Sequence, residues 1–167
     1  MENFQIHTDI SLLPANEHEA YLKEGFNGIC TGGSAVIQLF SVRYRISEGE
    51  LITILPQQLV SIGEISDDFS MTFFKVDKVM FLDIMSGLGK LTPAFFFYMR
   101  KNFSTPLCNE ECQRFIHFCH ILIYRINLPR NLFRRESIMQ LLRVFYWDIY
   151  VAYKRNPKAA ELVKYTR

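Results

Sequence analysis

The sequence predicts an α+β fold in which a half made of short antiparallel strands precedes a helical half. Two observations carry this prediction. Up to about residue 76, short runs rich in Val, Ile, Phe and Tyr are separated by turn signals. Beyond that point, longer segments carry helix caps and end close to prolines. Short strands of this kind are typical of a β-sandwich or small barrel, and the last two helices predict an antiparallel hairpin.

Six strands are expected in the first half. The segment Thr31-Gly32-Gly33-Ser34 predicts a hairpin turn, because adjacent glycines supply the positive φ angles of tight turns, and residues 47–50 predict a second hairpin. Within 42–46, Val, Tyr and Ile alternate with two arginines, so one side of this strand is expected to face water. The expected strands are 25–31, 34–40, 42–46, 51–55, 57–65 and 69–76.

Pro56 separates two of these apolar runs. Proline cannot donate a hydrogen bond to a strand ladder, so it is confined to strand ends and bulges. We therefore expect Pro56 to mark a corner where the chain passes from one sheet to another.

Four helices are expected in the second half. Thr92 is a suitable N-cap with Pro93 at the first helical position, and Pro129 and Pro157 end the two long helices. The expected helices are 77–88, 92–103, 109–127 and 134–155.

Length and charge exclude several classes of protein. The 167 residues are 49% hydrophobic and include fifteen Phe, which is enough for one packed domain. A net charge of +2, from 19 basic and 17 acidic residues, is too small for a free-standing nucleic-acid binder. The most apolar segment, 115–126, is too short to span a bilayer, and the N-terminus does not resemble a secretory signal. We expect a cytoplasmic protein without a membrane partner.

No catalytic, cofactor or metal motif is recognisable in the sequence, so we expect no enzyme activity, cofactor or metal. Cys30, Cys108, Cys112 and Cys119 lack zinc-finger spacing and are expected to be free thiols. A metal cluster of Cys108, Cys112 and His117 is the alternative. Acidic residues at 64, 67 and 68 are expected in a solvated turn, with paired-carboxylate catalysis as the alternative. The expected strands contain no histidine.

The two long helices carry surfaces that suggest a subunit contact. On the helix 109–127, polar residues spaced three or four apart form a stripe along one face. Three interpretations of this stripe are open: a solvated face, an incomplete metal site, or part of a subunit interface. The helix 134–155 is apolar nearly all round, which requires burial on more than one side, either in a single core or against a second chain. We favour a homodimer. The candidate dimer-interface residues are His117, His120, Tyr124, Arg143, Trp147 and Val151.

The strands also suggest a small-molecule pocket. Alternate residues of several strands share a face that would line the inside of a barrel, where either a ligand or simple core packing would occupy the space. The candidate ligand-binding residues are Phe26, Cys30, Tyr44, Ile46, Met71 and Phe73.

Two stretches resemble a known family. Gly25-Phe-Asn-Gly-Ile-Cys-Thr-Gly-Gly33 and Leu51-Ile-Thr-Ile-Leu-Pro-Gln-Gln58, followed by Ile65-Ser-Asp-Asp-Phe69, look like the N-terminal regulatory domain of AraC-type transcription regulators, particularly Bacteroidales-like members. The resemblance covers roughly 20–155. It implies a cupin-like barrel that binds an effector and a helical hairpin that dimerises. The sequence itself lacks the histidine ligands of metal-dependent cupin enzymes.

The resemblance also implies a division of the chain. Residues 1–80 would form the cupin-like β-barrel with an N-terminal arm, 81–156 the helical dimerisation region, and 157–167 a linker toward a DNA-binding module. The implied function is effector sensing and dimerisation, with a sugar or other metabolite as effector and DNA bound only through a C-terminal helix-turn-helix module absent from this chain. A stand-alone cupin-like sugar-binding protein or enzyme is the alternative, and a constitutive oligomerisation module with a filled barrel is a third possibility.

Overall fold

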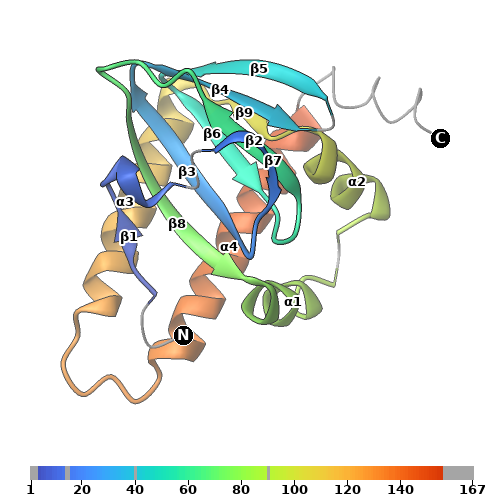
Figure 1. Cartoon of the computed structure of the whole chain (residues 1–167). Helices are drawn as coiled ribbons and strands as arrows, with labels where there is room; N and C mark the ends of the chain where they lie inside the picture. Colours follow the sequence, from blue (N-terminus) through green and yellow to red (C-terminus); the bar gives the residue numbers. More distant parts are fainter. Residues whose placement is uncertain (1–3, 14–15, 40, 90, 156–167) are drawn as a thin grey trace.

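The computed structural model describes residues 4–13, 16–39, 41–89 and 91–155 (Figure 1). It contains two antiparallel sheets and four α-helices, so the predicted α+β class is confirmed. No helix in these ranges is long and apolar enough to cross a membrane. The predicted linker, 157–167, lies outside the described residues.

The strands divide into two sheets, and all six expected strands are present with bounds shifted by at most two residues. Sheet A has the spatial order β1 (Ile6–His7), β8 (Ser70–Asp77), β3 (Glu24–Gly32), β6 (Glu50–Ile54) and β9 (Ser104–Pro106). Sheet B has the order β2 (Asn16–Tyr21), β7 (Leu59–Gly63), β4 (Ser34–Leu39) and β5 (Val42–Ser47).

The two predicted hairpin turns are wrong in their connectivity. The glycine turn at 31–34 joins β3 of sheet A to β4 of sheet B, and the turn at 47–50 joins β5 of sheet B to β6 of sheet A. Gly33 does adopt the positive φ that was expected, at +66°, and an added Cβ would lie 2.6 Å from the Phe69 backbone. The glycine turn therefore lets the chain cross from one sheet to the other. Strand pairing is decided by which strand faces are buried, and the turn alone does not set it.

Pro56 lies at a corner between sheets, as predicted. The strand before it, β6, ends in sheet A, and β7 begins after it in sheet B. The corner is closed by Gln58, whose side-chain oxygen accepts from the Leu55 N–H at 2.8 Å and whose amide donates to the Arg100 carbonyl at 2.7 Å.

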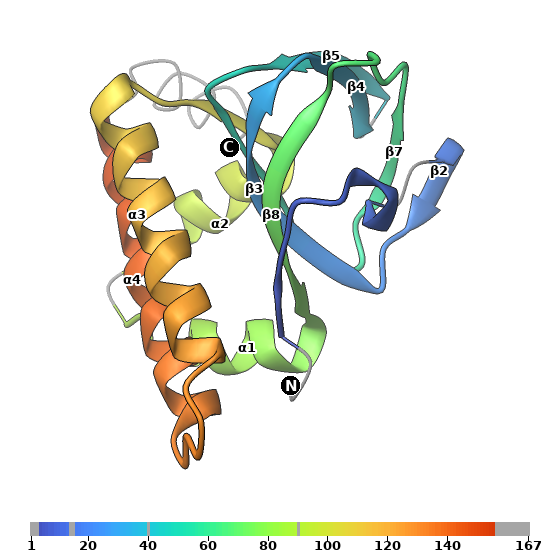
Figure 2. The same ribbon diagram turned by 90° about the vertical axis from the view of Figure 1, so that its left-hand side faces the viewer.

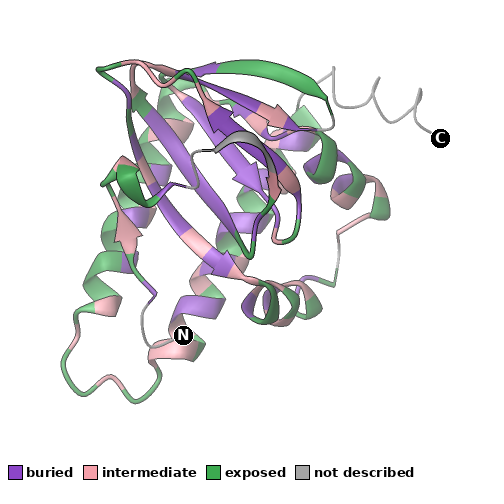
Figure 3. Ribbon diagram, in the orientation of Figure 1, coloured by how far each residue is buried: buried purple, intermediate pink, exposed green. Residues whose placement is uncertain are grey.

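The sheets pack face to face without closing into a barrel. No ladder between the described strands links sheet A to sheet B, so the predicted barrel or sandwich is an open sandwich. Its interior is a continuous buried cluster to which β3, β6 and β8 contribute from sheet A and β4, β5 and β7 from sheet B. Figure 3 shows β3, β4, β6, β7 and β8 as largely buried or partly buried, whereas β5 is exposed except at Ile46.

The four α-helices are α1 (Lys78–Ser86), α2 (Pro93–Lys101), α3 (Asn109–Ile126) and α4 (Arg134–Arg155). The starts of α1 and α2 follow from capping residues: the Asp77 side chain accepts from the Met80 N–H at 2.7 Å, and Thr92 accepts from the Phe95 N–H at 3.3 Å. The predicted α3–α4 hairpin is confirmed.

The helices form a third layer on the outer face of sheet A (Figure 2). Ile29, Phe74 and Val76 point from this sheet into a second buried cluster with helix residues such as Leu142 and Phe145. Phe74 is fully buried, and its ring lies 5.4 Å from that of Phe145. Sheet A is thus buried on both faces, each large apolar side chain contributing about 1.5–3 kcal/mol.

Three strands were not expected from the sequence: β1, β2 and β9. All three are edge strands, and β9 ends at Pro106, which edge positions tolerate. Their pairing with β8, β7 and β6 is decided by tertiary contact. The expectation that strands contain no histidine is therefore wrong, since His7 lies in β1 and His18 in β2.

Candidate functional site

Five of the six candidate ligand-binding residues lie together in the sandwich interior. Each of these side chains is at most 2% exposed and packs within the cluster between the sheets, where the rings of Phe26 and Phe73 are 6.3 Å apart. Their role in ligand binding stays a prediction. The five residues are Phe26, Cys30, Ile46, Met71 and Phe73.

Tyr44, the sixth candidate, is exposed at the rim of this cluster and is not buried within it. It is 42% exposed on the edge strand β5, and its ring contacts that of Phe103 at a centroid distance of 5.7 Å. Partial burial, with the charge of Glu50, raises the pKa of the Tyr44 hydroxyl. On the other side of this strand Arg43 and Arg45 form ion pairs with Glu64 at 2.8 and 2.9 Å, so its predicted wet face is confirmed.

A polar pocket, which we call the arm pocket, lies where the N-terminal segment meets the start of β3, the end of β8 and α1. Its volume is about 260 Å³. Antiparallel pairing of Glu24 with Asp77, and of Phe26 with Lys75, brings these strand ends together. Its lining residues are Phe4, Gln5, His7, Glu24, Lys75, Asp77 and Met80.

The charges around His7 define the chemistry of the arm pocket. Burial and the nearby Lys75 lower the pKa of the His7 imidazole, which favours its neutral form, while Glu24 opposes this shift. The ring lies 5.3 Å from that of Phe73, at the edge of the sandwich interior. The pocket thus presents an imidazole, an ammonium and carboxylates beside aromatic surface, which suits a small polar ligand with both donors and acceptors.

Sequence reasoning missed the arm pocket. Lys75 stands near the end of the expected strand 69–76 and Asp77 at the start of the expected helix 77–88. Their approach to Glu24 and His7 depends on strand pairings that the sequence does not reveal. The sequence offered one signal of this pocket, which is the presence of charged residues close to the end of an otherwise apolar strand.

Five of the six candidate dimer-interface residues are exposed on the helix hairpin. His117, His120 and Tyr124 are exposed on α3, whereas Trp147 and Val151, on α4, are 42% and 54% exposed. We call these five the hairpin face. The structure contains a single chain, so the dimer stays a prediction.

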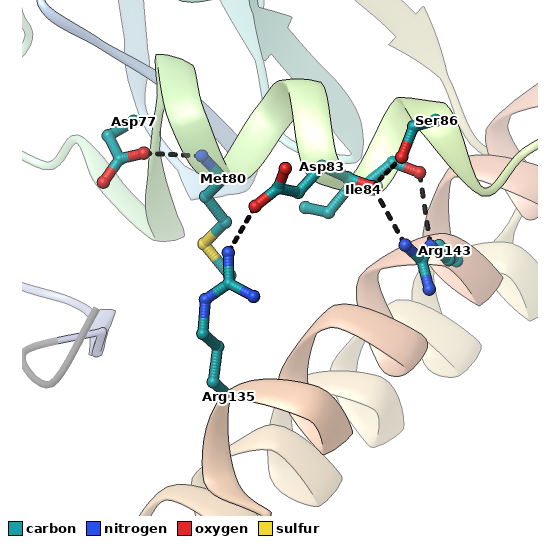
Figure 4. Close-up of polar contacts among 7 residues, drawn as sticks. All are labelled: Asp77, Met80, Asp83, Ile84, Ser86, Arg135 and Arg143. Atoms are coloured by element: carbon teal, nitrogen blue, oxygen red, sulfur yellow. Dashed lines mark hydrogen bonds and ion pairs between the residues drawn. The ribbon is translucent and has the colours of Figure 1, made fainter.

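Arg143, the sixth candidate, faces α1 of the same chain, and its place at a dimer interface stays a prediction. Its guanidinium donates to the Asp83 carbonyl at 2.9 Å and to the Ile84 carbonyl at 3.2 Å (Figure 4). These carbonyls lie at the C-terminal end of α1, where a cation is favourable. The neighbouring Arg135 forms an ion pair with the Asp83 side chain.

The alternative sites weighed from sequence are not assembled. Among the described residues, no three His, Cys, Asp or Glu side chains are grouped to hold a metal ion. Glu64 is paired with arginines, and Asp68 accepts from the Ser66 hydroxyl at 2.7 Å, which is the expected solvated turn. Burial raises the pKa of the Cys119 thiol to about 12, as expected for a thiol that packs as a small hydrophobe.

No protein-family model and no curated protein sequence matches the chain. Among solved structures, an apo lysine-to-alanine mutant of ToxT from Vibrio cholerae strain SCE256 has a TM-score of 0.54 over 90% of this chain and 53% of that chain, at 11% identity. Fatty-acid-bound wild-type ToxT from the same strain has a TM-score of 0.46, over 89% and 50%, at 11% identity. A serine-to-alanine mutant of oxalate decarboxylase from Bacillus subtilis has a TM-score of 0.32, over 36% and 17%, at 17% identity.

The match to the apo ToxT mutant establishes a shared fold. At 11% identity it carries no further information, and the chain spans about half the length of the ToxT structures it matches.

Proposed function

We propose that this chain is the effector-sensing and dimerisation domain of an AraC-type transcription regulator. The supporting observation is the fold shared with ToxT, an AraC-family regulator, over 90% of this chain. Residues 25–33 and 51–69, which carry the resemblance in sequence, form the central strands and corner of the sandwich. Control of transcription would pass through a helix-turn-helix module outside residues 1–167.

The effector site in this proposal is the arm pocket, with the aromatic interior of the sandwich beside it. The pocket lies where the sandwich meets the first helix, because His7 belongs to β1 of sheet A and Met80 belongs to α1. Its mixture of donors and acceptors favours a sugar or another small polar metabolite as effector. An effector that binds one arrangement of arm and helices more tightly would shift the population toward it.

Thermal unfolding of the chain with sugars, bile acids, aromatic acids and fatty acids tests effector binding. At 100 times its Kd, an effector stabilises the fold by about 2.7 kcal/mol. This corresponds to a rise in Tm of roughly 5–10 °C, at about 2–4 °C per kcal/mol. We expect Lys75→Gln and Glu24→Gln to reduce that rise.

Lys23→Gln is the matched control, since Lys23 is exposed and outside the arm pocket. A ligand-induced rise that survives both pocket variants would place the effector elsewhere. Absence of a rise with every compound would contradict effector sensing and favour a constitutive oligomerisation module.

A further inference from the structure

A second pocket lies in the helix layer, on the far side of sheet A from sheet B. It opens between α3 and α4 and reaches β6 and the segment after β9. We call it the helix pocket. Its lining residues are Leu51, Leu107, Glu111, Arg114, Phe115, Phe118, Phe145, Asp148, Ile149, Val151, Ala152 and Arg155.

The inner part of the helix pocket is apolar and narrow. Phe118 and Phe145 stack with centroids 5.5 Å apart, and Phe115 lies 5.7 Å from Phe145, so the ring cluster forms a firm wall. The free volume is about 60 Å³. Because a cavity of about 150 Å³ holds a benzene ring, this space suits a few aliphatic carbons better than an aromatic side chain.

Four charged side chains surround the opening, and two of them are already paired. Glu111 forms an ion pair with Arg155 and also accepts from the Cys108 N–H at 3.3 Å. The Glu111 side chain is mostly buried, with 14% of its surface exposed. This pair closes one end of the opening.

Arg114 on α3 and Asp148 on α4 both line the pocket, and no direct bond joins them. Partial burial raises the pKa of Asp148, and the positive charge of Arg114 opposes this shift. Within the described part of the chain neither side chain makes a hydrogen bond or an ion pair. The unbonded guanidinium of Arg114 and the unbonded carboxylate of Asp148 therefore flank an apolar cavity.

We propose that the helix pocket binds a small branched-chain α-amino acid. Its carboxylate would be bound by Arg114, its ammonium by Asp148, and its aliphatic side chain by the wall of Phe115, Phe118 and Phe145. Guanidinium groups bind carboxylates through paired donors, so this geometry selects a zwitterion over a molecule with one charge. The inference does not depend on the proposed regulatory function.

Calorimetric titration of the full chain with L-leucine and L-valine tests the helix pocket. We expect saturable binding of both amino acids. 4-Methylpentanoate lacks the ammonium of leucine, and 3-methylbutylamine lacks its carboxylate. Each should therefore bind at least about tenfold more weakly than L-leucine, as expected when one charge-assisted hydrogen bond is lost. L-Phenylalanine should also bind more weakly because its ring exceeds the cavity.

Three variants locate the binding. Arg114→Gln and Asp148→Asn, both at exposed positions, should each weaken L-leucine binding about tenfold. Ala152→Leu should abolish it by filling the cavity. Asp67→Asn, in the exposed turn before β8, removes the same charge outside the pocket and should change nothing.

Failure of both amino acids to bind at millimolar concentration would overturn the proposal. Binding that is unchanged in Arg114→Gln and Asp148→Asn would overturn it too, and these conservative surface changes provide that test even if Ala152→Leu does not fold.

Discussion

At the scale of single residues, one buried polar pair joins the sheets to the helices. Asn27 on β3 is 2% exposed, and its side-chain amide donates to the hydroxyl of Tyr146 on α4 at 3.1 Å. Burial raises the pKa of Tyr146, so the hydroxyl stays neutral. The Asn27 side-chain oxygen has no partner in the described residues. Because buried polar groups without partners are costly, this contact fixes how α4 sits on sheet A.

Removing one partner of this pair should destabilise the fold more than removing both. We expect Tyr146→Phe to lower the free energy of unfolding by about 1–3 kcal/mol, because Asn27 then keeps no partner at all. Adding Asn27→Leu should recover most of that loss. Urea denaturation of Tyr146→Phe, Asn27→Leu and the double variant measures these free energies of unfolding. A double variant whose loss equals the sum of the two single losses would contradict a coupled Asn27–Tyr146 pair.

At the scale of elements, α1 is a nine-residue helix held at both ends. Asp77 caps its N-terminus, and Arg143 and Arg135 of α4 bind its C-terminal turn (Figure 4). A helix this short is marginal alone, so contact with α4 supplies its stability. The next residue, Gly87, leaves room for the Arg143 guanidinium, because an added Cβ would lie 2.4 Å from its Nε.

Arg143→Met should lower the free energy of unfolding by about 1–2 kcal/mol through loss of charged donors at a helix C-terminus. Gly87→Ala should lower it by a similar amount, since the new methyl group displaces the same guanidinium. The two changes remove one interaction, so the double variant should cost less than their sum. Strict additivity in chemical denaturation would show that they act separately.

At the scale of the whole molecule, the chain forms three layers with sheet A in the middle (Figure 2). The helix layer covers the outer face of sheet A but leaves its own outer side uncovered in this single chain. The hairpin face there places a partly exposed Trp147 beside exposed aliphatic residues such as Val144 and Val151. Aromatic residues in an apolar patch are typical of protein interfaces.

We expect size-exclusion chromatography with light scattering to give a dimer at micromolar concentration. Trp147→Glu should convert it to a monomer without unfolding it, because the residue is 42% exposed. Leu132→Glu, at an 88% exposed position in the α3–α4 turn, is the control and should leave the dimer intact. A wild-type chain that is monomeric throughout would contradict the role of the hairpin face.

The local pattern of the sequence determined the fold class, six strands, four helices and the corner at Pro56, because alternation, caps and prolines act over a few residues. It also indicated a helix hairpin whose last helix is apolar on more than one side. Which strands pair was decided only in the tertiary structure, so the turns at 31–34 and 47–50 proved to be crossings between sheets.

The same limit applies to the sites. Arg143 lies on the outward side of α4 by helical spacing, and only the packing of α1 against that helix makes it an internal cap. The arm pocket and the helix pocket each join residues from three or more elements. Periodicity places a side chain on one face of its own element, whereas a pocket depends on contacts between residues far apart in the chain, which only the folded packing supplies.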